Sequence, residues 1–360
     1  GMLTATDVAS TTDSDDNDIA LTAGSGGLVA GIIAAGAVGD VNLSTTGSIT
    51  DAAGTIVAEV LTVSAGTGAV LDTDIDQIDA NSTAGDVTVT EVDGLLATNV
   101  NTGNGNVSVT AGDLEIKTIT AGNGGNVTLN SSGAITDTGS TVIANLLTAT
   151  ATNGIQVKTN VNAADLSVTG TGDINVVETD AIDLVDVDTA DGMITVTAAG
   201  TITAIDVDSS NTDDDTNDIA LTSTGGGIAL GAINAGAMND TALAAPMGAI
   251  TDLNGDSLNI TTGDLAASSA SGIGTITDFH SASGDPIEVT VNETLNQLAT
   301  TDAGGDINVK FIGGVPTISF AAITPGSGGA ADSLMQSDAS FNLNAFIGAQ
   351  NAIQDDRIGF

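Results

Sequence analysis

The residues best suited to chemistry in this 360-residue chain are aspartates that gather in two short clusters. Each cluster leads into the same six residues, Asn-Asp-Ile-Ala-Leu-Thr, at 17–22 and at 217–222. Calcium takes about six to eight oxygen ligands, and several carboxylates on one loop can supply most of them. The candidate Ca²⁺ ligands are therefore Asp13, Asp15, Asp16 and Asp18 in the first cluster, and Asp213, Asp214, Asp215 and Asp218 in the second.

Neither aspartate cluster completes a known calcium loop, so a hydrated acidic loop remains the alternative interpretation. The Asp-x-Asp-x-Asp-Gly order of a helix-loop-helix site is absent, as is the Gly-Gly-x-Gly-x-Asp nonapeptide of calcium-binding β-rolls. Further acidic runs alternate with apolar residues at 72–76 and 183–188. Like charges on adjacent strands repel unless cations bridge them. We interpret these runs as a solvated face that discourages aggregation.

Residues for catalysis are scarce. Glycoside hydrolysis needs two carboxylates across the scissile bond, and among 46 acidic residues such pairs arise by chance. Four basic residues are too few to hold an acidic polymer, and no Trp or Tyr is present to stack on a sugar ring. The single histidine, His280, lies in a Ser-rich segment where no nucleophile can be assigned to it. The sequence therefore predicts that the protein is not an enzyme, with a carbohydrate-active β-helix enzyme as an alternative.

The charge balance restricts the partners. With 46 acidic and 4 basic residues, the net charge is -42 at pH 7. Nucleic acids and anionic membranes both attract Lys and Arg, so we expect neither as a partner and favour cations or basic partners. No run of about 18 apolar residues is present to span a membrane. The chain has no cysteine and hence no disulfide framework, which suits an oxidising exterior without requiring one.

A recurring phrase predicts the elements that position these residues. It consists of Gly, a small residue and two apolar β-formers that flank a polar residue. The copies that begin at Gly85, Gly105 and Gly125 lie 20 residues apart, as do those at Gly172 and Gly192. A fixed period with strand-type alternation is the signature of stacked β-coils. We expect Val and Ile to face inward and Thr outward, with Gly, Asn and Asp at the corners.

Longer repeats predict the length and the register of the stack. At about 20 residues per coil, the chain would form roughly 16 to 18 coils and a rod on the order of 80 Å long. The segment at 47–62 returns 86 residues later, at 133–148, so some coils must carry extra corner residues. The segment at 17–22 returns 200 residues later, which equals ten coils of 20. We therefore expect both aspartate clusters on a common side of the rod.

The last fifty residues differ from the repeats. The phrase stops after Gly305, and most of the Phe residues and the only Arg follow it. A solenoid must cover its open end, so we divide the chain into a β-helix region, 1–310, and a C-terminal cap or end segment, 311–360. An interface for another domain or subunit is the alternative, because aromatic residues are enriched at interfaces. The Phe residues concerned are Phe311, Phe320, Phe341, Phe346 and Phe360.

The repeats resemble those of filamentous-haemagglutinin-like adhesins and related bacterial surface proteins. The resemblance rests on Gly-Asp-Val-Thr-Val-Thr at 85–90 and on Gly-x-Ile-Thr-Asp at 47–51, 133–137 and 248–252. It spans roughly residues 15 to 310 and is periodic, without a unique functional motif. It implies a right-handed parallel β-helix that is exported to the bacterial surface as a stalk or adhesive rod. The N-terminal secretion domain of that family is not evident in this sequence.

We therefore predict an all-β, right-handed parallel β-helix that acts as a non-enzymatic, adhesin-type rod outside the bacterial cell. The expected partners are a host-cell, surface or polysaccharide ligand, or neighbouring copies of the chain. The first alternative is a structural lattice or sheath protein crosslinked by Ca²⁺, the only cofactor that the sequence suggests. No export signal is visible, so we expect the chain to be a piece of a longer exported protein.

Overall fold

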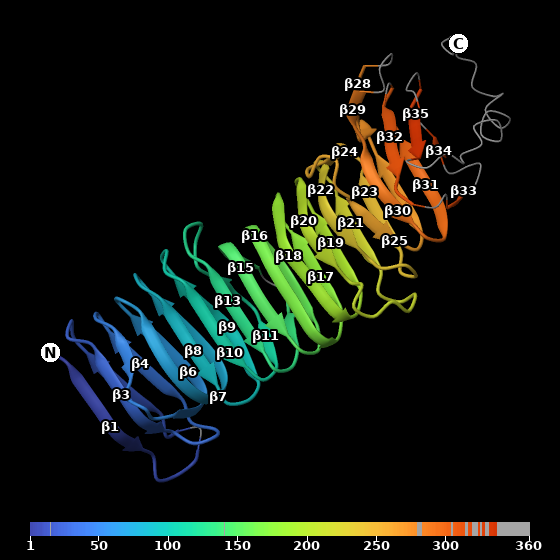
Figure 1. The fold of residues 1–360 in the computed structure, drawn as a ribbon. Coiled ribbons are helices and arrows are strands. Elements are labelled where there is room, and N and C mark those ends of the chain that lie inside the picture. The colour runs from blue at the N-terminus through green and yellow to red at the C-terminus, as the bar shows by residue number, and fades with distance from the viewer. Residues whose placement is uncertain are drawn as a thin grey trace, which may run out of the picture.

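Strands stacked along one axis make up the protein (Figure 1). The computed structural model describes residues 1–14, 16–139, 141–278, 283–303, 305–313, 316–318, 323–324, 326–327 and 331–336. Within them, the strands form a parallel β-solenoid of about 14 turns with about 20 residues per turn. The predicted all-β parallel β-helix is confirmed, and the described residues form fewer turns than the roughly 16 to 18 coils predicted for the whole chain. No helix in the described part of the chain is long and apolar enough to cross a membrane.

Most strands are short, and a few continue around a corner. The first twelve are β1 (Leu3–Ala9), β2 (Ile19–Ala23), β3 (Leu28–Ala34), β4 (Val41–Thr45), β5 (Ile49–Asp51), β6 (Ile56–Ala65), β7 (Ala69–Ser82), β8 (Val87–Glu91), β9 (Leu95–Thr102), β10 (Val107–Ala111), β11 (Leu114–Ile116) and β12 (Ile119–Thr120). The next twelve are β13 (Val127–Ser131), β14 (Ile135–Asp137), β15 (Val142–Ala151), β16 (Ile155–Thr171), β17 (Ile174–Glu178), β18 (Ile182–Asp191), β19 (Ile194–Ala198), β20 (Ile202–Asp208), β21 (Ile219–Ser223), β22 (Ile228–Asn234), β23 (Thr241–Ala245) and β24 (Ala249–Asp252). The last described strands are β25 (Ile260–Thr262), β26 (Leu265–Ser269), β27 (Gly272–Ile273), β28 (Thr275–Asp278), β29 (Ser283–Asp285), β30 (Ile287–Val291), β31 (Thr294–Thr300), β32 (Asp306–Phe311), β33 (Thr317–Ile318), β34 (Ile323–Thr324) and β35 (Ala331–Gln336).

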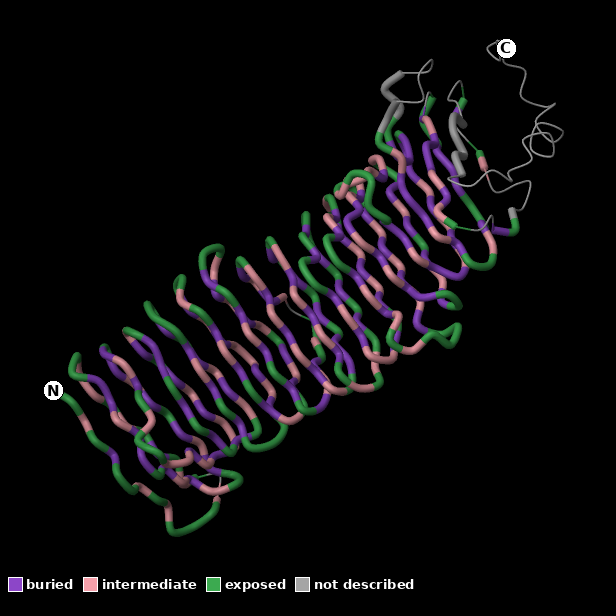
Figure 2. Tube along the Cα trace, viewed as in Figure 1, coloured by how far each residue is buried: buried purple, intermediate pink, exposed green. Residues whose placement is uncertain are grey.

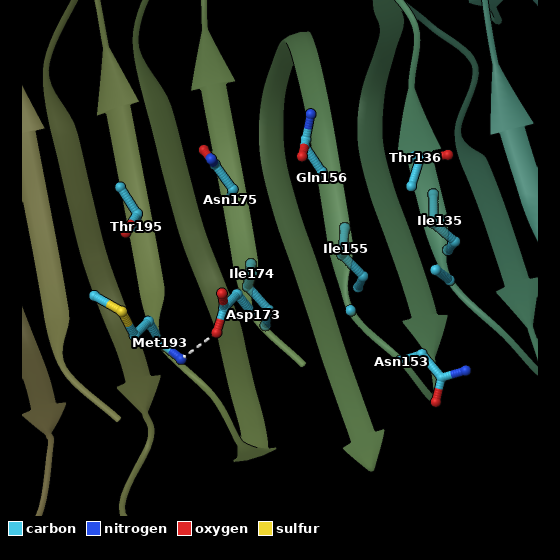
Figure 3. A pocket seen from close by; sticks show the side chains of 12 residues that line it. Ile135, Thr136, Asn153, Ile155, Gln156, Asp173, Ile174, Asn175, Met193 and Thr195 are labelled. Carbon is cyan, nitrogen blue, oxygen red and sulfur yellow. Dashed lines mark hydrogen bonds between the residues drawn. The ribbon is translucent and has the colours of Figure 1, made fainter. Parts of the chain in front are cut away.

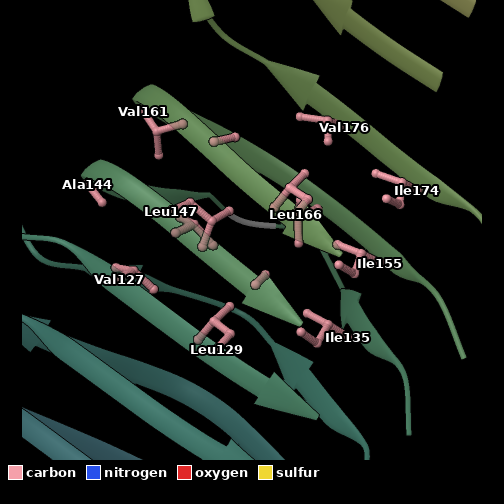
Figure 4. Close-up of a cluster of buried hydrophobic side chains, with 14 of the residues drawn as sticks. Val127, Leu129, Ile135, Ala144, Leu147, Ile155, Val161, Leu166, Ile174 and Val176 are labelled. Carbon is pink, nitrogen blue, oxygen red and sulfur yellow. The ribbon is translucent and has the colours of Figure 1, made fainter. Parts of the chain in front are cut away.

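The apolar residues of the phrase fill one core that runs along the axis. In β13, Val127 and Leu129 are fully buried, while Thr128 between them is half-buried on the outside. Figure 2 shows this alternation of buried and more exposed positions along most turns. In Figure 4, buried Leu and Ile side chains of successive turns, such as Leu147 and Leu166, meet inside the solenoid. Burying each such side chain contributes about 1.5–3 kcal/mol, so the core is the main source of stability.

Copies of the phrase that lie 20 residues apart stack directly on one another. Val87 in β8 pairs with Val107 in β10, and Val107 pairs with Val127 in β13. Each phrase therefore places like side chains above like side chains, as expected for a parallel stack of equal coils. The predicted inward Val and outward Thr or Ser are confirmed for these strands.

Insertions lengthen particular turns. Ala204 in β20 pairs with Leu230 in β22, and the intervening chain contains the second aspartate loop at 209–218. Ile273 in β27 pairs with Ile307 in β32, and this most expanded turn contains the hairpin β28–β29. That hairpin is the antiparallel pair among the described strands, whereas the strands of the stack pair in parallel. Such insertions lengthen these turns beyond 20 residues and so lower the number of turns that the described residues form.

The two copies of Asn-Asp-Ile-Ala-Leu-Thr are joined by ten successive strand pairings. The series runs β2–β4, β4–β6, β6–β7, β7–β9, β9–β11, β11–β14, β14–β16, β16–β17, β17–β19 and β19–β21. The strand after the first aspartate cluster, β2, thus lies in the same stack as the strand after the second, β21. At about 4.8 Å per turn, the two loops lie roughly 48 Å apart on a common side, as predicted.

Parallel pairing continues beyond the predicted boundary at residue 310. Phe311 is buried at the end of β32 and belongs to the hydrophobic core, and β32 pairs with β35. The other four Phe residues of the predicted cap, Phe320, Phe341, Phe346 and Phe360, lie outside the described residues. The cap stays a prediction.

Candidate functional site

The two predicted calcium loops adopt the same local arrangement. The first connects β1 to β2 and the second connects β20 to β21. In each, an asparagine Nδ2 donates to a backbone oxygen five residues earlier: Asn17 to Thr12 and Asn217 to Thr212, both at 2.9 Å. The repeated residues therefore produce a repeated loop, closed by its own asparagine.

The first aspartate of each loop binds the backbone of the following turn. Asp13 Oδ1 accepts the N–H of Val38 at 3.1 Å. In the second loop, Asp213 accepts two N–H groups, from Met238 at 2.7 Å and from Ala237 at 3.1 Å. A charged acceptor makes a stronger hydrogen bond than a neutral one. These two carboxylates therefore hold the loop against the next coil.

The last aspartate of each loop also accepts a backbone N–H group of the following turn. Asp18 Oδ1 accepts the N–H of Asp40 at 3.1 Å, and Asp218 Oδ1 accepts the N–H of Asp240 at 2.8 Å. The outer two aspartates of each loop thus bind backbone amides of their own solenoid. Their geometry gives them a structural task that does not depend on an ion.

The other loop aspartates face solvent where the structure describes them. Asp16, Asp214 and Asp215 are exposed, and Asp214 accepts the hydroxyl of Thr216 at 2.7 Å. Asp15 lies outside the described residues. Calcium binding by these loops stays a prediction.

Asx side chains at the start of the phrase form a second set of links between turns. Asp86 Oδ1 accepts the N–H of Asn106 at 2.7 Å, and Asn106 Oδ1 accepts the N–H of Asn126 at 3.0 Å. Asp173 Oδ1 binds the N–H of Met193 in the same way at 2.9 Å. The sequence places these residues at corners, but it does not reveal that each carries a bond to the next coil.

Two glutamates are buried at corners, which sequence reasoning missed. Glu91 and Glu178 are 5% and 2% exposed, and they end β8 and β17. Each accepts an N–H from the long strand one turn earlier, Ile75 in β7 at 3.2 Å and Val161 in β16 at 3.0 Å. Each also accepts the N–H of the residue that follows it, at 2.8 and 2.6 Å. The signal in the sequence is a Glu where other phrase strands end in Ala, Ser or Thr.

Glu91 is also part of a compact acidic group. One carboxylate oxygen each of Glu91, Asp74 and Asp93 lie within 4.8 Å of one another, and this is the one group of three acids so placed among the described residues. Burial raises the pKa of Glu91 above its ordinary value, while a hydrogen bond with Thr73 and bonds from backbone amides lower it. Both Glu91 oxygens already accept backbone N–H groups. This group therefore carries no ligand assignment of its own.

A polar groove runs along one outer face of the middle turns. Thr136, Gln156, Asn175 and Thr195 pair in register on four successive strands, β14, β16, β17 and β19. They line a hollow of about 270 Å³ together with Asp173, whose bond to the next turn is the dashed line in Figure 3. These side chains offer amide and hydroxyl groups at the spacing of the coils. We name this surface the outer groove.

The outer groove continues toward the N-terminus with a different lining. A second hollow, of about 520 Å³, shares Thr136 with the first and is bordered by Leu96, Glu115, Asp76 and Asp113. Leu96 pairs with Glu115, and Glu115 pairs with Thr136, so both hollows follow one row of outward positions. Along the axis, this row of outward residues thus changes from Leu96 and Glu115 at one end to neutral polar side chains such as Gln156 and Asn175 at the other.

Four ionisable side chains and one amide gather near hairpin β28–β29. We name this group, Asp252, Asn259, Asp285, Glu288 and Lys310, the hairpin corner. The buried Asn259 joins its parts, because Nδ2 donates to Asp252 Oδ1 at 2.8 Å and Oδ1 accepts the N–H of Glu288 at 2.9 Å. Lys310 Nζ lies 3.2 Å from Glu288 Oε1. Sequence reasoning missed this group because its members come from separate strands that only the expanded turn brings together.

The sequence pattern and the geometry of the solenoid are the guides to function. No protein-family model, curated protein or solved structure matches the chain. His280, the single imidazole, lies outside the described residues.

Proposed function

We propose that the chain is the rod of an exported bacterial surface protein of the adhesin type, and that it is not an enzyme. The observation that supports this most is the unbroken stack, in which parallel pairing runs from β1 to β35 around one hydrophobic core. Each turn rests on its neighbours, so the stack is stiff along its axis and can hold a binding surface away from its anchor. The net charge of -42 keeps such rods apart in solution.

The outer groove is the contact surface that we assign to a ligand. Its neutral stretch presents Gln156, Asn175 and Thr195, whose amide and hydroxyl groups pair with hydroxyl-rich polymers. Lys and Arg do not line it, so it suits a neutral polysaccharide better than an acidic one. A linear chain lying along the axis would meet the same kind of side chain once per turn, about every 4.8 Å.

Binding to immobilised neutral and acidic polysaccharides tests this proposal. We expect retention on a neutral polymer and at least a tenfold loss of affinity in the double variant Gln156→Ala with Asn175→Ala, corresponding to about 1.4 kcal/mol. Asn130→Ala is the matched control, because Asn130 is an exposed amide on β13 outside the groove. Equal binding by all variants would place the contact elsewhere, and release of sugar fragments over time would show that the protein is an enzyme.

A lattice of neighbouring copies is the second candidate function, and the first turn favours it. β1 pairs with β3 on one side, and its other edge has no strand partner among the described residues. An open strand edge is a template for another strand. Concentration-dependent filaments in electron micrographs would support a lattice, whereas single rods at every concentration would exclude assembly through this edge.

A further inference from the structure

Asparagine is followed by glycine at four corners of the chain, and the structure distinguishes these pairs. An asparagine in this position can lose its side-chain amide, because the backbone nitrogen of the glycine attacks the side-chain carbonyl carbon. Glycine has no Cβ to shield that nitrogen. The reaction needs a side-chain amide that is free to turn toward the backbone and open to water. The four pairs are Asn104-Gly105, Asn123-Gly124, Asn153-Gly154 and Asn254-Gly255.

Asn153 meets these conditions at the corner that leads into β16. Its side chain is exposed, and no hydrogen bond from the described residues holds its amide. Gly154 is buried, and its N–H has no acceptor among the same residues. The imide ring that forms in the reaction has no N–H at this position, so its closure breaks no hydrogen bond of this nitrogen.

The corner itself requires the glycine that makes Asn153 reactive. Gly154 has φ 117°, a conformation that residues with a side chain rarely adopt. The neighbouring backbone groups are bonded to the preceding turn, because the N–H of Asn153 donates to the oxygen of Gly133 at 2.9 Å and the oxygen of Gly154 accepts the N–H of Ile135 at 3.0 Å. The corner is therefore anchored, while the two groups that would react are unoccupied.

Asn254, by contrast, is held by its surroundings. Its Nδ2 donates to the backbone oxygen of Gly231 at 2.6 Å, and its Oδ1 accepts the Nδ2 of Asn259 at 2.9 Å. Its own N–H donates to Asp252 Oδ1 at 2.8 Å. The side-chain bonds must break before the amide carbon can reach the nitrogen of Gly255, and each of them stabilises the unreacted state. This pair should therefore react more slowly than Asn153-Gly154.

Asn153 differs from the other exposed pairs in its location. It lines the 270 Å³ hollow of the outer groove, in which Asp173 is the one carboxylate, and Figure 3 shows it at the corner just before Ile155. Asn104 and Asn123 are also exposed, but they line neither hollow of the groove. Loss of the Asn153 amide would thus place a second carboxylate in the neutral stretch of the groove.

We propose that Asn153 is a site of spontaneous deamidation, which makes the outer groove acidic. Hydroxide removes the N–H proton of Gly154, and the nitrogen forms a bond to Asn153 Cγ. The C–N bond of the side-chain amide breaks, and its nitrogen takes a proton from water and leaves as ammonia. Water then opens the imide ring at either carbonyl, which yields aspartate or isoaspartate. In sum, asparagine and water give the acid and ammonia.

The two products should affect the protein differently. Aspartate keeps the backbone but offers only acceptors, whereas the amide offers donors as well, and a carboxylate is costly to cover with a ligand. Isoaspartate also adds a carbon to the backbone at Asn153, between the bonds to Gly133 and Ile135, so it should loosen this corner. The effect on binding rests on the proposed function of the groove, whereas the modification does not.

Ageing of the whole chain, followed by peptide mapping, tests the modification. The protein is incubated at neutral and at mildly alkaline pH, and mass spectrometry of its digests separates asparagine, aspartate and isoaspartate peptides. We expect conversion at Asn153 to be at least tenfold faster than at Asn254, corresponding to about 1.4 kcal/mol. It should also be faster at the higher pH, because ring closure begins with loss of a proton. No conversion at Asn153, or equal rates at the two sites, would overturn the proposal.

Matched variants separate the modification from its effect on the groove. Asn153→Asp reproduces one product and should weaken binding to an immobilised neutral polysaccharide about threefold, corresponding to about 0.7 kcal/mol. Asn104→Asp adds the same charge outside the groove and should bind as the unaltered chain does. Asn153→Gln keeps an amide but would need a larger ring, so its binding should not decline with age. Circular dichroism verifies that each variant is folded.

The two measurements distinguish failure of the modification from failure of the groove as a contact surface. Conversion of Asn153 together with unchanged binding by Asn153→Asp would support the modification and count against the groove as the place where a polymer binds. A stable Asn153 would overturn the modification, whatever the groove binds.

Discussion

The regular turns from β8 to β19 and the expanded turns from β24 to β32 bury carboxylates in opposite ways. Glu91 and Glu178, in the regular turns, have both oxygens bonded to backbone N–H groups. Glu288 and Asp252, in the expanded turns, each keep one buried oxygen without a partner. The regular turns thus supply a backbone donor for both oxygens of each of these buried carboxylates. In the expanded turns, this match between donors and acceptors is lost for one oxygen of each carboxylate.

The largest expected effect is on the free energy of unfolding when a buried leucine is shortened. It tests whether the two regions differ only in their buried polar groups or also in their apolar packing. Leu129 and Leu295 are both fully buried, one in each region. Because the core is continuous, we expect Leu129→Ala and Leu295→Ala to lower the free energy of unfolding by about 2–5 kcal/mol each. Denaturant unfolding measures both, with the exposed Val70→Ala as a control that should change stability by less than about 0.5 kcal/mol. A much smaller loss for Leu295→Ala would mean that packing, too, differs between the regions.

The next effect concerns the buried glutamates of the regular turns. Glu178→Ala should cost about 1–3 kcal/mol of unfolding free energy, because the N–H of Val161 loses its side-chain acceptor inside the corner. Glu115→Ala, on the outer face, is the matched control and should be close to neutral. If Glu178→Ala were neutral as well, the regular turns would not depend on matched carboxylates and the comparison would fail.

A smaller effect is expected for the Asx links between turns. Asp86 accepts the N–H of Asn106 at an exposed corner, so Asp86→Ala should lower the unfolding free energy by about 0.5–1.5 kcal/mol. Thr88→Ala, an outward residue of the same phrase, provides the reference. Indistinguishable melting of both variants would show that water replaces the link without loss.

The smallest effect is a pH dependence of the stability of the expanded turns. The folded pKa values of Glu288 and Asp285 are raised, so folding favours the protonated forms. Stability from these groups is present below their unfolded pKa values, near 4, and is lost as the pH rises through the folded values. Protection of β30 amides, corrected for intrinsic exchange, should therefore increase from pH 7 toward about pH 5. Glu288→Gln should flatten this increase, and an unchanged slope would remove Glu288 from the explanation.

The repeating part of the fold was predictable because period and alternation are local signals. Gly85, Gly105 and Gly125 mark coils of equal length, and the paired Val residues that follow them fill the core as expected. The number of turns was not predictable, because insertions such as hairpin β28–β29 leave no periodic trace. The hairpin corner was hidden for a related reason: only the expanded turn brings Glu288 beside Asn259, which bonds the Asp252 carboxylate and the Glu288 backbone N–H and looks in the sequence like an ordinary polar residue.

The ten pairings between β2 and β21 also bear on how the length of such a rod can change. Because the second aspartate loop follows the first by whole turns, both point in the same angular direction around the axis. Inserting or deleting complete coils between them would alter only the distance, in steps of about 4.8 Å. Extra residues that do not complete a coil form corner loops instead, as at 209–218, and the strands on either side stay in register. The length of the rod and the side on which each surface lies can therefore vary independently. Duplication of whole coils lengthens the rod and leaves each surface on the same side.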